Sequence, residues 1–145
     1  MAQVIVTAER EVAGSHQQVR AALADYAQTR PKILTEHFSD YQVREGGQGA
    51  GSRVHWKFAA TSKRVRDQLV EVSEPDDGSL VEKDANSSML TTWRVAESGE
   101  GRSRVSVITT WDGAGGIGGF FERTFAPKGL RRVYDEMIGK LDTVL

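Results

Sequence analysis

The sequence predicts an α+β domain in which a curved antiparallel sheet of about seven strands wraps around one long C-terminal helix, with two short helices after the first strand. Three observations predict this fold. Apolar and polar residues alternate along several consecutive segments, turn-forming residues separate those segments, and the last segment has helical spacing. Because most of the strands follow one another without intervening helices, we expect an antiparallel sheet with its helices on one face.

Composition limits the classes of function. The 145 residues favour a single domain over residues 1–145. A net charge of -1 argues against electrostatic capture of nucleic acid. The absence of cysteine excludes disulfides, thiolate nucleophiles and cysteine-based metal sites. The N-terminal residues lack the features of a secretion signal, and no apolar run approaches the roughly 20 residues of a membrane span. We therefore expect a cytoplasmic protein without a membrane span, whose oligomeric state stays open.

The first 40 residues are expected to form one strand and two short helices. Residues 3–12 alternate as a strand does. Ser15 is positioned to cap a following helix, with Gln18 closing a capping box. A second helix is expected from Arg30, because Pro31 in a first helical turn loses no hydrogen bond. The residues expected on the buried face of this second helix are Ile33, Leu34 and Phe38.

Six further segments are predicted to be strands. They read YQVRE, SRVHWKF, KRVRDQLVEVS, SLVEKD, SMLTTWRVA and SRVSVITTW, and turn-formers such as GGQGAG, PDDG and ESGEG separate them. The clearest alternation places Val54, Trp56 and Phe58 on one face. Leu69 and Val70 break the alternation in the third segment, which predicts a bulge there. The alternation does not fix where four carboxylates point, namely Asp67, Glu71, Glu82 and Asp84.

The glycines at residues 113–119 precede the final helix, which is expected from about residue 117 to residue 144. Gly113, Gly115 and Gly118 match the G-x-G-x-x-G pattern of dinucleotide-binding turns. A dinucleotide-binding turn is followed by a helix and then by a parallel strand, which carries an acidic residue that binds the ribose. No strand follows the helix here. The glycines are better explained as a sharp, pliable connection between sheet and helix. We expect no nucleotide and no other cofactor.

The whole chain resembles a known superfamily. The residues that carry the likeness are VTAEREVAGSHQQVRAALADY, GGQGAGSRVHWKF, the EPDDG turn and FFERTFAPKGLRRVYDEMIGKL. Their order is similar to the helix-grip fold of START-like, or Bet v 1-like (SRPBCC), proteins, and within them to bacterial polyketide cyclase/dehydrase-like proteins. The resemblance implies a cavity between sheet and helix that takes an apolar or amphipathic small molecule.

The inward-facing aromatic residues are the candidate lining of such a cavity. Aromatic side chains either fill a core or leave a pocket in which a ligand supplies the missing contacts. Thr91 and Thr109 share the inward face, and their hydroxyls need partners, either a ligand group or a neighbouring strand. The candidate ligand-binding residues are Trp56, Phe58, Met89, Thr91, Trp93, Val107, Thr109, Trp111, Phe121, Phe125 and Tyr134.

Catalytic and metal-binding residues are harder to assign. His16, His37 and His55 have no metal-ligand spacing, so we expect no metal site. His37 is the one histidine placed for acid–base work, near the expected mouth of the cavity. No G-x-S-x-G nucleophile elbow is present. A carboxylate inside an apolar pocket would be a candidate general acid or base.

Three functions follow from these observations. The first is binding of a small hydrophobic or amphipathic molecule, lipid- or polyketide-like, with the residue 113–119 hinge gating access. The second is a cyclase/dehydratase-type enzyme that uses an inward acidic residue with a threonine or tyrosine. The third is a protein-interaction module with a filled core. The sequence leaves open whether any reaction is catalysed, and the identity of the ligand.

Overall fold

A computed structural model describes residues 3–61, 64–112 and 116–145, with the side chains of these ranges except residues 60, 61, 64 and 116–126. The elements are β1 (Gln3–Val12), α1 (His16–Ala24), α2 (Thr29–Ile33), β2 (Phe38–Glu45), β3 (Arg53–Thr61), β4 (Arg64–Ser73), β5 (Leu80–Asp84), β6 (Leu90–Gly99), β7 (Arg102–Asp112) and α3 (Gly116–Val144). This order confirms the predicted fold class.

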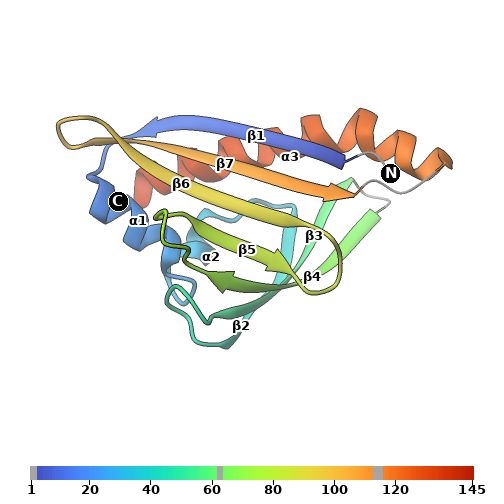
Figure 1. The fold of residues 1–145 in the computed structure, drawn as a ribbon, viewed down its shortest axis with the longest axis horizontal. Coiled ribbons are helices and arrows are strands. Elements are labelled where there is room, and N and C mark those ends of the chain that lie inside the picture. Colours follow the sequence, from blue (N-terminus) through green and yellow to red (C-terminus); the bar gives the residue numbers. More distant parts are fainter. Residues whose placement is uncertain (1–2, 62–63, 113–115) are drawn as a thin grey trace.

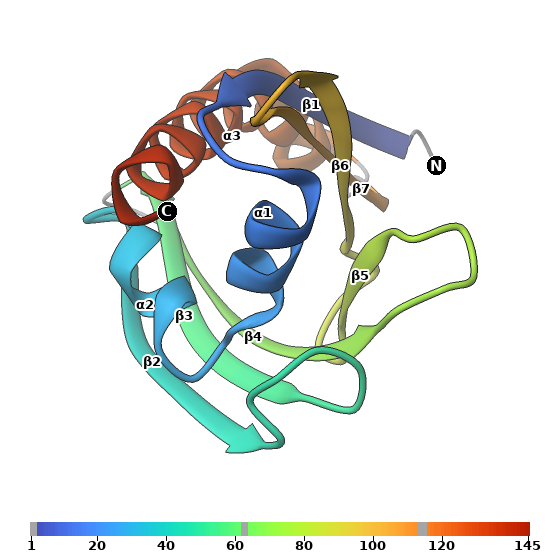
Figure 2. The same ribbon diagram turned by 90° about the vertical axis from the view of Figure 1, so that its left-hand side faces the viewer.

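The seven strands form one antiparallel sheet in the order β1-β7-β6-β5-β4-β3-β2. Neighbours in sequence therefore pair as a meander from β2 to β7, and β1 adds to the free edge of β7 (Figure 1). Seen from the end, the sheet curves into an open ring, with α3 and α2 across its opening and α1 at the end facing the viewer (Figure 2). Strand twist favours such curling.

The core fills the concave side of the sheet. On β7 the buried residues Val105, Val107 and Trp111 alternate with exposed ones such as Ile108, as the sequence predicted. The face of α3 opposite them buries residues such as Ile138 and Leu141 completely. Fully burying one such aliphatic side chain contributes about 1.5–3 kcal/mol, so this interface is a main source of stability.

The local expectations hold near the N-terminus with one correction. Ser15 caps α1 and forms the predicted capping box with Gln18. Pro31 lies in the first turn of α2, and Ile33 is buried. Phe38, however, begins β2 instead of ending the helix face. The reason is that the chain leaves α2 in an extended conformation at Leu34.

The predicted bulge at Leu69 and Val70 was wrong. Both residues keep regular register with β3, and the irregularity in this pair falls between Phe58 and Thr61. Two apolar residues in a row fit a regular strand here because Val70 faces the core while Leu69 lies half-buried on the other face, opposite His55.

The glycines of the β2–β3 connection hold the neighbouring helices in place. Gly49 has a φ of 57°, and a Cβ atom on it would collide with Glu74 Oε2, so this position favours glycine. The backbone N–H of Gly49 donates to Ala24 O at 2.9 Å, and the N–H of Tyr26 donates to Gly47 O at 2.9 Å. The connection thus fixes the segment between α1 and α2.

The second glycine cluster is only partly described. Residues 113–115 lie outside the described residues, so the predicted hinge at 113–119 stays a prediction there. The remaining residues of the cluster already belong to α3. Across the described ranges, none of the helices is both long and apolar enough to cross a membrane.

Candidate functional site

A cavity of about 40 Å³ lies between the sheet and α3. Six of its lining residues were predicted from the sequence: Trp56, Phe58, Met89, Thr91, Trp93 and Tyr134. The other apolar or aromatic wall residues are Leu34, Phe38, Tyr41, Val70, Leu130 and Met137. Four polar residues complete the lining, namely Arg30, Gln68, Glu82 and Asp84. The wall is therefore largely apolar with a few polar groups, as small-molecule sites usually are.

The remaining predicted residues lie elsewhere. Val107, Thr109 and Trp111 are buried in β7 but do not line this cavity. The side chains of Phe121 and Phe125 lie outside the described residues. Within the described part of the chain, the structure thus brings the predicted residues of β3 and β6 together with Tyr134 of α3.

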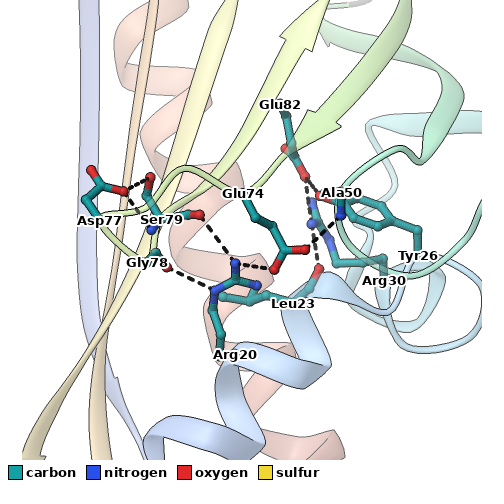
Figure 3. A network of polar contacts seen from close by, with 10 residues as sticks. All are labelled: Arg20, Leu23, Tyr26, Arg30, Ala50, Glu74, Asp77, Gly78, Ser79 and Glu82. Atoms are coloured by element: carbon teal, nitrogen blue, oxygen red, sulfur yellow. Dashed lines mark hydrogen bonds and ion pairs between the residues drawn. The ribbon is translucent and has the colours of Figure 1, made fainter.

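A buried ion pair forms the polar side of the cavity. Arg30 Nη1 donates to Glu82 Oε2 at 2.7 Å, and the two side chains are only 3% and 4% exposed. The same oxygen accepts the hydroxyl of Tyr26 at 2.5 Å, while Oε1 accepts Trp93 Nε1 at 3.1 Å. Arg30 Nη1 also donates to Leu23 O at 3.0 Å. Glu82 therefore connects β5 to Arg30 of α2 and to Tyr26, which follows α1 (Figure 3). Its bond to Trp93 also connects it to β6.

The electrostatics of this cluster favour the charged form of Arg30. Burial acts to lower its pKa, but the Glu82 carboxylate outweighs burial, and the pKa is raised. The guanidinium also lies over the rings of Tyr26 and Trp93, at 4.7 Å and 5.2 Å from their centroids. Cation–π contacts of a desolvated arginine stabilise it further. The guanidinium of Arg30 is therefore a positively charged group in the cavity wall.

Sequence reasoning missed Arg30 as a site residue. It stands in the segment TRPKI, where it looks like one of two solvent-facing basic residues, and its partner is 52 residues away. The direction of Glu82 had been left open, and the structure turns it inward with Leu80 and Asp84. One signal in the sequence indicated the direction of Glu82: it lies two residues after Leu80 and therefore shares its face in a strand. β5 is too short for this pattern to be decisive.

Three hydroxyls form a second polar group. Thr91 Oγ1 and Thr109 Oγ1 lie 2.8 Å apart on neighbouring strands, and Thr109 also hydrogen-bonds to the hydroxyl of Tyr134. Glu82, Thr91 and Thr109 are direct cross-strand partners on β5, β6 and β7, which makes a polar row across the sheet. Of the two alternatives for the threonines, the partner on a neighbouring strand is the one observed.

The buried hydroxyl of Tyr134 makes the folded protein less stable at alkaline pH. Burial raises its pKa from 10.0 to about 12. Below pH 10 the folded and unfolded states hold the same proton, so its contribution is fully present. Between pH 10 and 12 only the unfolded state ionises, so stability falls as pH rises. Between pH 10 and 11 we expect the Tyr134→Phe variant to lose about 1 kcal/mol less free energy of unfolding than the wild-type protein, measured by urea unfolding.

Tyr26 and Tyr41 add to the same alkaline loss, since burial raises the pKa of each hydroxyl. Some pH slope should therefore remain in the Tyr134→Phe variant. An unchanged slope would contradict the assignment of a buried, protonated hydroxyl at residue 134.

Gln68 forms a third polar group. Trp56 Nε1 donates to Gln68 Oε1 at 2.7 Å, and Gln68 Nε2 lies 2.9 Å from Met89 Sδ. An indole N–H only donates, so this bond fixes which end of the amide faces which neighbour. The Nε2 donor is left with a thioether sulfur, which is a weak acceptor.

The other titratable candidates have structural surroundings. Asp84 Oδ1 accepts the N–H of Leu69 at 3.0 Å, and Oδ2 accepts the hydroxyl of Ser87 at 2.6 Å, which fixes the β5–β6 turn. Asp67 is exposed and pairs with His55 at 2.8 Å. Glu71 is also exposed.

The described lining of the cavity includes no histidine, and His37 Nδ1 lies 3.0 Å from Ala59 O. The described residues include no group of three or more histidines and carboxylates able to hold a metal ion.

A more exposed network lies beside the ion pair. Arg20 of α1 contacts Glu74 Oε1 at 2.7 Å and donates to Gly78 O at 3.2 Å (Figure 3). Glu74 Oε2 accepts the N–H of Ala50 at 2.8 Å, and this bond contributes to the lowered pKa of Glu74. The network ties α1 to the β4–β5 and β2–β3 connections, close to the cluster that holds Arg30.

Comparison with solved structures gives close and distant matches. The KanY protein, solved in solution, is 49% identical, with 99% of this chain and 98% of that chain covered and a TM-score of 0.89. The Zhui aromatase/cyclase from Streptomyces sp. R1128 is 13% identical, covers 99% and 93%, and has a TM-score of 0.78. A START superfamily protein from Mycobacterium smegmatis is 11% identical, covers 97% and 99%, and has a TM-score of 0.75. The last two show a shared fold.

Comparison with curated proteins finds no match. The family model described as "Polyketide cyclase / dehydrase and lipid transport" matches residues 3–145, nearly the whole chain. Together with the curved sheet and the long α3, this match confirms the resemblance found in the sequence. The chain belongs to the polyketide cyclase/dehydrase and lipid transport family, and it has the helix-grip fold of START-like and Bet v 1-like proteins.

Proposed function

We propose that this protein binds a small hydrophobic or amphipathic molecule, lipid- or polyketide-like, in the cavity between the sheet and α3. The observation that carries the proposal is the cavity itself, whose apolar wall is interrupted by the Arg30–Glu82 pair and by Gln68. Apolar surface supplies affinity, and a few fixed polar groups supply orientation. Membership of a family that includes lipid transport and polyketide chemistry supports the same conclusion.

The size of the cavity adds a condition. A volume of about 40 Å³ holds about three water molecules, whereas sites for drug-sized ligands span about 300–1,000 Å³. Binding therefore requires wall side chains to move. Met89 and Met137 both line the cavity, and methionine changes rotamer readily to fit irregular contents. A ligand would occupy the space that these two side chains vacate.

Each predicted residue has a place in this proposal. Trp56, Phe58 and Trp93 would contact the apolar body of the ligand, together with Met89, Thr91 and Tyr134. Thr109 would act through the hydroxyls of Thr91 and Tyr134. Val107 and Trp111 would pack in the core beside the wall. Contacts from Phe121 and Phe125 remain predictions from the sequence.

Filling the cavity should abolish binding. We expect the wild-type protein to bind the apolar dye Nile red and Leu130→Phe to bind it at least tenfold more weakly, because Leu130 lines the cavity. Arg132→Phe adds the same ring to the exposed face of α3 and should bind like wild type. Fluorescence titration measures this, and native mass spectrometry of fresh protein would identify a co-purified ligand. Equal binding by all three proteins would place the dye elsewhere and defeat the proposal.

The inward carboxylate favours a second candidate, a cyclase/dehydratase-type enzyme. Glu82 would act as the acid or base, beside the hydroxyls of Thr91 and Tyr134. Abstraction of a proton next to a carbonyl would be the shared first step of such reactions. Deuterium exchange at that carbon of a bound ketone in heavy water, followed by NMR, tests this step. Exchange that Glu82→Gln abolishes supports an enzyme, whereas binding without exchange supports a carrier or sensor.

A further inference from the structure

We infer that the cavity selects a ligand that carries an uncharged acceptor oxygen, such as a ketone, ester or amide carbonyl, and discriminates against carboxylates and amines. This inference rests on the proposed binding function and specifies the chemistry of its ligand. The wall of the cavity has hydrogen-bond donors without good acceptors, whereas its own acceptors are already occupied.

Arg30 supplies the first open donor. Its Nη1 makes both hydrogen bonds to Glu82 and Leu23. Its Nε is buried and has no hydrogen-bond partner among the described residues. A buried N–H without an acceptor is costly, and a ligand oxygen in the cavity would remove that cost.

Gln68 supplies the second open donor. Because Trp56 occupies Oε1, the amide nitrogen must face Met89, whose sulfur is a poor substitute for oxygen. The nitrogen carries two hydrogens, and Met89 is its only hydrogen-bond partner among the described residues. An oxygen that displaces the flexible side chain of Met89 would be a better acceptor for the same group.

The three hydroxyls of Thr91, Thr109 and Tyr134 do not add an open donor. Thr109 hydrogen-bonds to both Thr91 and Tyr134. A hydrogen bond with Thr91 also acts on the pKa of Tyr134. The three hydroxyls can therefore satisfy one another, and the open donors of the wall are on Arg30 and Gln68.

The acceptors of the wall, in contrast, are already occupied. Glu82 accepts three hydrogen bonds, from Tyr26, Arg30 and Trp93. Asp84 also accepts three, from Leu69, Asn86 and Ser87. A ligand ammonium or amide N–H would therefore find few free acceptors. The wall favours a ligand that accepts.

Charge then separates carbonyls from carboxylates. The charged residues of the lining are Arg30, Glu82 and Asp84, and all three are buried. Arg30 is already neutralised by Glu82 at 2.7 Å. A ligand carboxylate would add a third negative charge in a desolvated space, which is strongly unfavourable. An uncharged carbonyl oxygen accepts the same hydrogen bonds without that repulsion.

Three naphthalenes of matched shape test the inference: 2-acetylnaphthalene, 2-naphthoate and 2-ethylnaphthalene. At pH 7 we expect the ketone to bind the wild-type protein at least tenfold more tightly than the carboxylate and at least fivefold more tightly than the hydrocarbon, measured by calorimetry or NMR titration. In Gln68→Leu the ketone should lose at least fivefold while the hydrocarbon is unchanged. Gln42→Leu, on the exposed part of β2, should retain the wild-type order.

The outcomes distinguish a failure of this inference from a failure of the proposed binding function. If the hydrocarbon binds as tightly as the ketone, or the carboxylate binds most tightly, the cavity still binds ligands but the inference is wrong. If Gln68→Leu retains the full preference for the ketone, the assignment of Gln68 is wrong. If none of the three compounds binds, both the inference and the proposed function fail.

Discussion

Replacing Glu82 with alanine is expected to lower the free energy of unfolding by about 3–5 kcal/mol. The carboxylate is 4% exposed and neutralises an arginine that is 3% exposed. Its removal leaves the guanidinium of Arg30 as an uncompensated buried charge. It also leaves the hydroxyl of Tyr26 and the indole N–H of Trp93 without their acceptor. Each loss alone costs stability, because buried polar groups are expensive when unpaired.

Urea unfolding of three variants measures this effect. Glu97→Ala is the matched control, since Glu97 is exposed on β6, and its loss should change stability by less than about 0.5 kcal/mol. The double variant Arg30→Met with Glu82→Leu removes both charges and should recover much of the stability lost in Glu82→Ala. A Glu82→Ala variant as stable as the control would show that the ion pair is not buried as described.

Trp93→Ala is expected to cost about 3–5 kcal/mol, the usual range for deleting a buried large aromatic residue. Trp93 is 1% exposed and meets Tyr134 edge-on, with ring centroids 5.8 Å apart. Its ring also lies under the guanidinium of Arg30, and its Nε1 donates to Glu82. Truncation therefore opens a void between the sheet and α3 and weakens the ion pair at the same time.

Two further variants separate packing from hydrogen bonding in this effect. Trp93→Phe retains most of the ring contacts but loses the indole donor, so it should cost clearly less than alanine. Ile108→Ala is the control on the outer face of the same sheet, where the side chain is 39% exposed, and should cost less than about 1 kcal/mol. Equal losses in Trp93→Ala and Ile108→Ala, read by thermal or urea unfolding, would contradict the packing described here.

The ion pair also explains how a short helix defines a binding site. α2 has only five residues, too few to be stable alone. Arg30 anchors it to β5 through Glu82, and the glycine-rich β2–β3 connection anchors the residues before it. Because Arg30, Leu34 and Phe38 all line the cavity, these anchors set the shape of one wall.

The sequence by itself determined the class and order of the fold. Alternation such as Val54, Trp56 and Phe58 identified the strands and their inward face, because the period of two in a strand is a local property. The Ser15 capping box fixed the start of α1 for the same reason. The aromatic residues of β3 and β6 that line the cavity lie on the face that this alternation indicates, whereas Tyr134 on the opposite wall belongs to the helical spacing of the last segment.

The tertiary structure alone decided the polar chemistry of the site. Glu82 meets Arg30 across 52 residues, and its row with Thr91 and Thr109 depends on the register of three strands. Register and the docking of α2 arise from packing over the whole sheet, so no local pattern encodes them. The same reason explains why Gln68 and Arg30, the two open donors, were absent from the residues that the sequence suggested.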